Sequence, residues 1–122
     1  MPRKAHKLAF PKKLPKKYYS HFVRGYFDGD GSIHFNKPNV IKIRIVGYGP
    51  FIEDLKSKVE ETTKIISTEA KKWPGCYGIE FYGNNARAFC KWIYKDSGKL
   101  YLERKHKRYI NHLKKRAIMW GT

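Results

Sequence analysis

Residues 22–35 read FVRGYFDGDGSIHF and pass from a helical pattern to a strand pattern. Apolar residues recur at helical spacing through the first part, at Tyr18, Tyr19, Phe22, Val23, Tyr26 and Phe27. Residues 32–36 then alternate between polar and apolar side chains, which is the period of a strand. The stretch therefore predicts a helix from Tyr18 to about Gly29, followed by a strand.

The next segment predicts a hairpin and a second helix. Residues 37–39 have the composition of a turn, and residues 41–45 alternate again, so the two strands pair as an antiparallel hairpin. Pro50 begins a helix, which ends near Thr62, where β-branched residues take over. Its apolar stripe consists of Phe51, Ile52, Leu55 and Val59.

The last third predicts a second hairpin and two helices. Residues 65–72 and 77–82 form the strands, joined through residues 73–75. Asn84 or Asn85 is a candidate N-cap for a helix with Ala86, Phe89, Cys90 and Ile93 on one face. A final helix after Gly98 carries a stripe of Leu102, Tyr109, Ile110, Leu113 and Ala117. The order αββαββα predicts an α+β fold with an antiparallel sheet packed on helices.

The composition predicts a basic, nucleic-acid-binding domain. The 122 residues are enough for one domain, and the net charge of +17 implies a polyanionic partner, most simply nucleic acid. Residues 1–17 contain seven Lys and Arg and three prolines, which predicts an extended basic arm. The domain itself then spans residues 18–122.

The sequence argues against a membrane-spanning or a secreted protein. No apolar run approaches the roughly 18–20 residues that cross a membrane, and the basic N-terminus lacks the apolar core of a secretion signal. Cys76 and Cys90 have no metal-ligand spacing and are expected to be reduced thiols. We therefore expect an intracellular protein.

The glycines and aspartates of the first helix predict a metal site between two copies of the chain. Gly25 and Gly29 lie on one face of the predicted helix. Each glycine costs about 1 kcal/mol of helix stability relative to alanine, so the pair suggests that another helix packs closely on this face. Gly29 alone could instead be a C-cap. Asp30 then lies where the helix dipole disfavours an anion. Two such carboxylates meeting at a helix pair would require a divalent cation. Carboxylate ligands next to a phosphate partner favour Mg²⁺ as the cation and phosphodiester hydrolysis as the reaction. The alternative, a calcium-binding loop, would need a Glu at EF-hand spacing, and none follows.

Residues 23–31, VRGYFDGDG, resemble the nine-residue motif of the LAGLIDADG homing endonucleases, and the predicted order αββαββα is similar to their core. The resemblance implies a site-specific double-strand DNA endonuclease that promotes intron or intein mobility. One motif implies a homodimer on a long pseudo-palindromic site, with Tyr18, His21, Phe22, Gly25 and Gly29 at the interface. The alternative is a non-cleaving RNA maturase or DNA-binding regulator on the same fold.

The resemblance also implies the roles of individual residues. Asp30 would bind catalytic Mg²⁺ beside the Gly29 carbonyl, with Mn²⁺ as a substitute and Ca²⁺ supporting binding without cleavage. Asp28 lies on the polar flank of the helix and is a secondary site residue with a structural role. Lys105 would stabilise charge at the reacting phosphate, with Arg104 as its rival and a plain phosphate contact as the alternative role.

A polar side chain on the second strand often completes the family's site, and Arg44 or Lys42 would be nearest. The sheet would read the DNA. If Ile33, Phe35, Ile41, Ile43 and Ile45 face the core, alternation turns Ser32, His34, Asn36, Lys42 and Arg44 to the opposite face. The second hairpin offers Glu69, Lys71, Tyr77, Ile79, Glu80 and Tyr82.

A two-stranded ribbon fits the major groove, where Arg reads guanine, Asn adenine and Glu cytosine. The arm and the basic residues Lys114, Lys115 and Arg116 are expected to bind phosphates.

Overall fold

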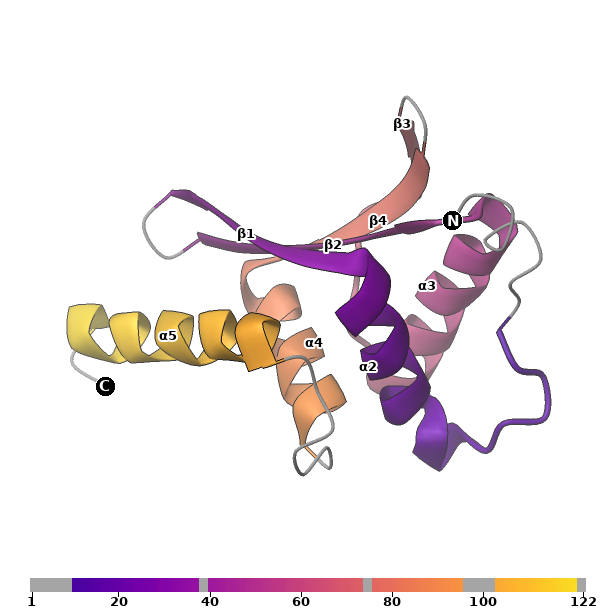
Figure 1. Ribbon diagram of the computed structural model, residues 1–122, viewed down its shortest axis with the longest axis horizontal. Helices are drawn as coiled ribbons and strands as arrows, with labels where there is room; N and C mark the ends of the chain where they lie inside the picture. Colours follow the sequence, from indigo (N-terminus) through magenta and orange to yellow (C-terminus); the bar gives the residue numbers. More distant parts are fainter. Residues whose placement is uncertain (1–9, 38–39, 74–75, 96–102, 121–122) are drawn as a thin grey trace.

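The computed structural model describes residues 10–37, 40–73, 76–95 and 103–120, and it places the helices on one side of an antiparallel sheet (Figure 1). The elements are η1 (Lys16–Tyr18), α2 (Tyr19–Asp30), β1 (Gly31–Lys37), β2 (Val40–Gly47), α3 (Gly49–Thr63), β3 (Lys71–Trp73), β4 (Cys76–Tyr82), α4 (Gly83–Tyr94) and α5 (Glu103–Trp120). The predicted α+β class is confirmed. None of the described helices is long and apolar enough to cross a membrane.

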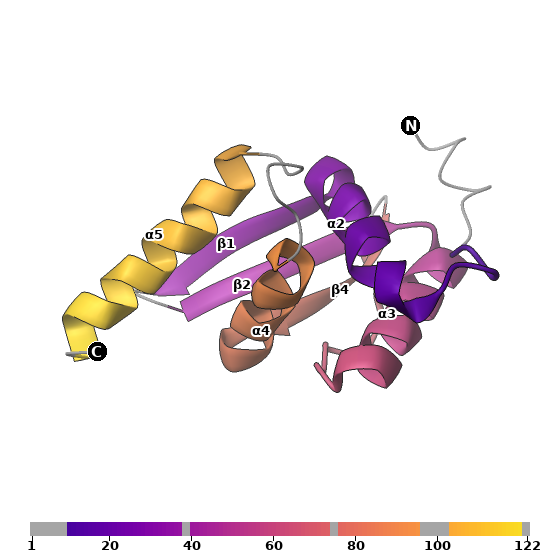
Figure 2. The same cartoon turned by 90° about the horizontal axis from the view of Figure 1, so that it is seen from below.

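The sheet joins the two hairpins through their second strands. Its order is β1-β2-β4-β3, and all three pairings are antiparallel. Ile43 of β2 pairs with Ile33 of β1 and with Phe81 of β4, so apolar side chains form a row across one face. Seen from below, α2, α3 and α4 lie across this face, and α5 runs along the β1 side (Figure 2).

The core lies between the sheet and these helices. The stripes predicted for α3 and α4 are confirmed, because every one of their residues is buried: Phe51, Ile52, Leu55, Val59, Ala86, Phe89, Cys90 and Ile93. In α2, Val23 and Phe27 face the same core. Phe27 contacts the ring of Phe89 on α4, with ring centroids 5.7 Å apart, so the two helices pack directly on each other.

The predicted arm contributes to this core. Phe10 is buried, with its ring centroid 4.8 Å from Phe22 and 5.1 Å from Tyr19. Of the arm predicted over residues 1–17, residues 1–9 lie outside the described part of the chain. Phe10 joins the core because burial of its ring is favourable, whereas most of residues 11–17 are exposed.

The strand predicted over residues 65–72 is wrong for most of its length, since β3 covers Lys71–Trp73 alone. Lys64 has a left-handed backbone (φ 65°) that ends α3. The chain then passes beside β4, where the Thr68 N–H donates to the Glu80 carbonyl at 2.8 Å and the Glu80 N–H donates to Thr68 Oγ1 at 3.1 Å. The Thr68 hydroxyl oxygen thus replaces a backbone carbonyl as the acceptor for the Glu80 N–H, and the regular strand β3 begins only after this residue.

The predicted cap of α4 is also wrong. The helix begins at Gly83 after the N-cap residue Tyr82, and neither asparagine caps it. Asn85 Oδ1 accepts a hydrogen bond from the Ile66 N–H at 3.1 Å, and Asn84 Oδ1 accepts one from Arg87. Gly83 has φ +54°, which allows the chain to turn from β4 directly into the helix.

The apolar stripe of α5 differs from its prediction. Tyr109 is buried, but Leu113 is exposed and its neighbour His112 is buried instead. The reason is the position of α5 beside β1, which brings the His112 ring to 5.6 Å from the ring of Phe35. Leu102 and the side chain of Ala117 lie outside the described residues.

Candidate nucleic-acid-binding and metal site

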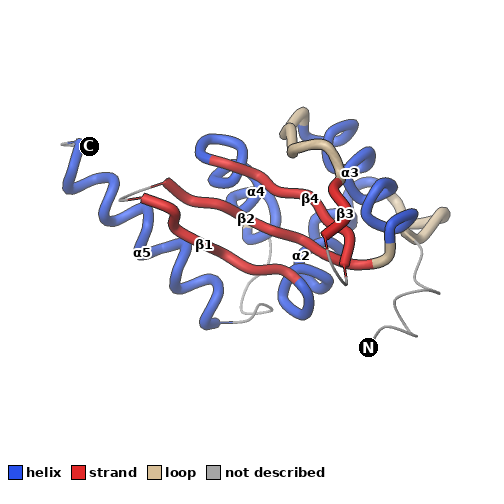
Figure 3. Tube along the Cα trace, turned by 90° about the horizontal axis from the view of Figure 1, so that it is seen from above, coloured by secondary structure: helices blue, strands red, loops and turns tan. Residues whose placement is uncertain are grey.

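The face of the sheet opposite the helices is not covered by any described element (Figures 1 and 3). Strand alternation and register place on it the predicted residues Ser32, His34, Lys42, Arg44, Lys71, Glu80 and Tyr82. Asn36 lies in β1, but its side chain is outside the described part. The open face is therefore lined by basic and hydrogen-bonding side chains.

Two residues predicted for this surface face the helices instead. Tyr77 lies on the same side as the buried Ile79 and Phe81, packs over Gly49, and donates its hydroxyl to Glu53 on α3 at 2.8 Å. Tyr77 and Ile79 are therefore wrong as candidates for base contacts. The alternation of β4 turns its odd-numbered residues toward the core. The sequence alone had not decided which residues of this strand face the core.

Phe35 departs from its prediction in the opposite sense. It was expected in the core, but 39% of it is exposed. The Arg108 guanidinium of α5 lies 5.5 Å from its ring centroid, which is a cation–π distance. Phe35 thus lies at the margin between the sheet and α5.

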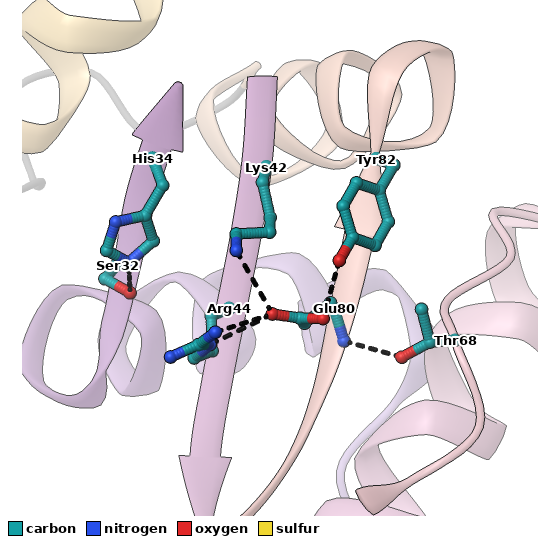
Figure 4. Close-up of polar contacts among 7 residues, drawn as sticks. All are labelled: Ser32, His34, Lys42, Arg44, Thr68, Glu80 and Tyr82. Carbon is teal, nitrogen blue, oxygen red and sulfur yellow. Dashed lines mark hydrogen bonds and ion pairs between the residues drawn. The ribbon is translucent and has the colours of Figure 1, made fainter. Parts of the chain in front are cut away.

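The polar side chains form two rows across the strands. In the first row Ser32, Arg44 and Glu80 are register partners, and in the second Lys42 pairs with both His34 and Tyr82. Figure 4 shows Lys42, Arg44 and Tyr82 pointing toward Glu80, while Ser32 and His34 contact each other on β1. Such cross-strand neighbours are close enough to interact directly.

Glu80 is the centre of this network. Its Oε2 accepts hydrogen bonds from Arg44 Nε at 3.0 Å and from a second guanidinium nitrogen, Nη2, at 2.9 Å, and Lys42 Nζ lies 3.6 Å from the same oxygen (Figure 4). Its Oε1 accepts the Tyr82 hydroxyl at 2.7 Å. The carboxylate is thus engaged by three side chains, although Glu80 was predicted to contact a base.

Burial and charge act in opposite directions on Glu80. Only 3% of the residue is exposed, and burial alone would raise the pKa of its carboxyl. Hydrogen bonds from Tyr82 and Arg44, together with the charges of Lys42 and Arg44, outweigh this and lower the pKa. Glu80 is therefore ionised at neutral pH and neutralised within its own chain.

His34 lies at the basic margin of the same face. Its Nε2 is 2.8 Å from Ser32 Oγ. Partial burial lowers the pKa of its imidazole, and the charges of Lys42, Arg44 and Arg108 lower it further. At neutral pH His34 is accordingly neutral, so it offers a donor and an acceptor and adds no charge.

The second part of the site is the C-terminal end of α2. Asp30 is the last helical residue and is exposed, as is Gly29, whereas Asp28 is partly buried. None of the ion pairs among the described residues involves Asp30. Gly31 begins β1 immediately afterwards, so the carboxylate lies where the helix enters the sheet.

Lys105, in the first turn of α5, reaches this helix end. Its Nζ donates to the carbonyls of Phe27 at 2.8 Å and Asp28 at 2.9 Å, and it lies 5.1 Å from the Phe27 ring centroid. Burial lowers the pKa of its ammonium, and Arg104 acts in the same direction, while Asp28 and Asp30 oppose the shift. Lys105 therefore caps the negative end of α2.

The structure brings Lys105 and the two aspartates together and leaves Arg104 exposed. The Gly29 carbonyl, predicted as a metal ligand, is not an acceptor for Lys105, whose two bonds go to Phe27 and Asp28.

The glycine face of α2 is exposed in the single chain. Gly25 and Gly29 are both exposed, and a Cβ added at either position would meet no atom within 4 Å. Tyr18, at the start of this face, is 45% exposed, while Phe22 is partly buried against Phe10 and Phe51. Packing among the described residues therefore gives no reason for glycine at these two positions.

One buried cation was not singled out by the sequence. Arg24 is 5% exposed; its Nη1 donates to the Ile93 carbonyl in the last turn of α4 at 2.8 Å, and its Nη2 lies 2.8 Å from His21 Nδ1. His21, predicted at the dimer interface, is thereby held on the helix. The sequence signal that could have revealed this buried cation was the position of Arg24 among apolar residues of the predicted helix.

The described residues of one chain were compared with what a divalent cation requires. Among the described residues no cluster of three or more His, Cys, Asp or Glu side chains is placed to hold a metal. An exposed carboxylate at a helix end nevertheless fits Mg²⁺, which binds through one or two carboxylates together with phosphate and water. Asp30 meets this requirement if a second carboxylate or a phosphate is supplied from outside the chain.

Comparison with known proteins adds no relative: no family model, curated protein or solved structure matches this chain.

Proposed function

We propose that the chain is a homodimeric, metal-dependent, site-specific DNA endonuclease of the LAGLIDADG type, acting in intron or intein mobility. The observation that carries the proposal is the position of Asp30. It is an exposed carboxylate at the junction between the glycine-faced helix α2 and the open, basic sheet. A carboxylate beside a phosphate-binding surface is unfavourable unless a cation lies between them.

The open sheet supports DNA as the partner. A two-stranded β-ribbon fits the major groove of B-DNA, where Lys and Arg donate to guanine, and the surrounding positive charge attracts phosphates. Lys42, Arg44 and Lys71 supply donors on this face, and Ser32 and His34 supply smaller polar groups. Lys114 and Lys115 of α5 are exposed and are suited to phosphate contacts.

The glycine face of α2 supports the homodimer. Residues without side chains let two helix backbones approach closely, and the space around Gly25 and Gly29 is open. If the two helices pair in parallel through this face, about a two-fold axis that runs along them, the two Asp30 residues would lie at the same end of the interface. The dimer thus supplies the second carboxylate that one chain lacks.

In this proposal each residue near the helix end has one task. Asp30, with the Gly29 carbonyl beside it, would hold the metal, and Mg²⁺ would supply Lewis-acid stabilisation of the phosphate oxygens. Lys105 holds the end of α2 through the Phe27 and Asp28 carbonyls and keeps a positive charge near Asp30. The sheet orients the phosphodiester relative to these groups.

A second candidate is a non-cleaving nucleic-acid-binding protein, such as an RNA maturase or a DNA-binding regulator on the same fold. The capping contacts of Lys105 favour it, since they give this residue a structural reason to be present without chemistry. The two candidates differ in whether Asp30 takes part in a reaction.

The decisive experiment is cleavage of a randomised duplex library. The protein is incubated with the library in Mg²⁺, Mn²⁺ or Ca²⁺, and the new ends are sequenced. We expect one family of pseudo-palindromic sites cut in Mg²⁺ and Mn²⁺, and bound but uncut in Ca²⁺. Selection of a duplex sequence by binding, without cleavage in any metal, would instead support the second candidate, and the same selection with an RNA library would separate a maturase from a DNA-binding regulator.

A further inference from the structure

The open face of the sheet has an acidic residue at its centre. Glu80 is the only Asp or Glu within the four described strands, and it is 3% exposed although no described element covers this face. Its burial comes from the surrounding side chains of Lys42, Arg44 and Tyr82 (Figure 4). A carboxylate on a surface that meets phosphates weakens non-specific attraction, so its position calls for a function.

We propose that Glu80 is a positioning residue that presents Arg44 and Lys42 together for the recognition of guanine in each half-site. The proposal rests on the proposed function, since it concerns the DNA that the open face would bind. It assigns Glu80 an indirect role, because among the described residues its carboxylate contacts only side chains of its own chain.

The geometry explains how one carboxylate orders two long side chains. Arg44 donates to Oε2 through two nitrogens, Nε and Nη2, which fixes the plane of its guanidinium. Lys42 Nζ lies 3.6 Å from the same oxygen, so both cationic groups converge on one point above β2 and β4. Arg and Lys lose considerable rotamer freedom when they bind, and an ordered pair has lost part of it beforehand.

The rest of the network holds Glu80 itself. Tyr82 donates its hydroxyl to Oε1, and the Glu80 N–H donates to Thr68 Oγ1. Both partners belong to the same chain and remain in place without DNA. The carboxylate is therefore anchored on the side away from Arg44 and Lys42.

The chemistry of the two ordered side chains selects the base. Both present only N–H donors, and guanine is the base that offers two acceptors, N7 and O6, at its major-groove edge. Because the two cations converge, we expect one guanine or two adjacent guanines in each half-site. The Glu80 charge also offsets one of the two cations, which disfavours indiscriminate binding to phosphates.

The test is site selection in Ca²⁺ with wild type, Glu80→Gln and Glu53→Gln. Glu53 is the matched control, since it also accepts a tyrosine hydroxyl but lies on the helical side. We expect Glu80→Gln to reduce the preference for guanine at the selected position about tenfold, the scale of one good side chain–base contact, and to steepen the salt dependence. Glu53→Gln should retain the wild-type preference.

A second variant and a DNA-free measurement complete the test. Tyr82→Phe removes the bond to Oε1 without changing charge and should give a smaller loss of guanine preference. NMR of the Arg44 Nε–H without DNA should show slow exchange with solvent in wild type and fast exchange in Glu80→Gln.

Unchanged guanine preference in Glu80→Gln, accompanied only by a lower melting temperature, would overturn the proposal in favour of a structural role. Equal exchange of the Arg44 Nε–H in both proteins would overturn it as well. Failure of wild type to select any sequence would instead contradict the proposed function, and the NMR result would still decide whether Glu80 orders Arg44.

Discussion

Asp30 and Glu80 carry the same charge in opposite surroundings. Glu80 lies in the middle of the sheet and is surrounded by Lys42, Arg44 and Tyr82 of its own chain. Asp30 lies at the end of α2, exposed and outside the ion pairs of the described residues. The Glu80 carboxylate is already paired with cations of its own chain, whereas the exposed Asp30 carboxylate is accessible, as the proposed metal site requires. The comparison separates a positioning carboxylate from a proposed metal ligand.

The strongest test of this comparison is Asp30→Asn. We expect it to reduce single-turnover cleavage at least about 10²–10³-fold, the scale of losing a principal electrostatic group, while DNA affinity in Ca²⁺ stays equal or rises. Asp28→Asn is the neighbouring control; because Asp28 is partly buried beside Lys105, it should affect stability more than rate. Rapid cleavage by Asp30→Asn at saturating Mg²⁺ would remove Asp30 from the metal site.

Lys105→Ala tests how the environment of Asp30 is maintained. It removes two charge-assisted hydrogen bonds from the end of α2, so we expect the free energy of unfolding to fall by about 1–3 kcal/mol. Single-turnover cleavage of bound DNA should slow about 10²-fold.

The matched control for Lys105 is Arg104→Ala, which removes an exposed cation from the same turn and should change neither quantity. Urea unfolding and cleavage at saturating protein measure both effects. If Lys105→Ala loses stability but cuts at the wild-type rate once bound, the residue is a helix cap without a catalytic part. That outcome would show that the positive charge near Asp30 does not contribute to cleavage.

Gly25→Leu tests whether a second Asp30 is brought to the site. The position is open in the single chain, so the substitution should not destabilise the fold, and leucine even favours helix. In the proposed dimer the added volume should weaken association about 10–100-fold. Sedimentation over a range of protein concentrations measures this.

Gly31→Ala provides the contrast, because the added Cβ would clash with Phe27 Cδ1 and the substitution should destabilise the chain itself. A monomeric wild type at micromolar concentration, with and without DNA, would contradict the shared site.

The smallest effect concerns the pH dependence of stability at Glu80. The folded pKa of this carboxyl lies below its ordinary value of about 4.5, because the hydrogen bonds and cations outweigh burial. Its stabilising contribution is therefore complete above about 4.5 and is lost as the pH falls through the folded pKa. Urea unfolding between pH 3 and 7 should show a shallower pH dependence in Glu80→Gln. An unchanged curve would show that the network does not stabilise the ionised form.

The sequence predicted the elements better than their edges. Periodicity identified four helices and the first hairpin because burial imposes a strict pattern on α3, α4 and the strands. It failed over residues 65–72, where the Thr68 side chain takes a backbone hydrogen bond that a strand would make. It also placed a cap at Asn85, whose side chain instead bonds the Ile66 N–H, a partner far away in sequence.

The candidate site was predictable in its local part and unpredictable where partners are distant. Asp30 and the glycine face follow from one helix, and the structure leaves both exposed. The role of Glu80 depends on β2 and β4 being neighbours, which alternation alone does not reveal. The contact of Lys105 with the Phe27 carbonyl likewise joins segments that are 78 residues apart.

The direct passage from α2 into β1 has a consequence for the length of the target. No residue separates Asp30, the end of the helix, from Gly31, the start of the strand, and the Phe27 ring leaves Gly31 no room for a side chain. In the proposed dimer, each sheet is joined rigidly to one helix of the central pair, so the distance between the two DNA-binding sheets would be fixed. Inserting even one base pair between the half-sites would then move one of them out of reach of its sheet.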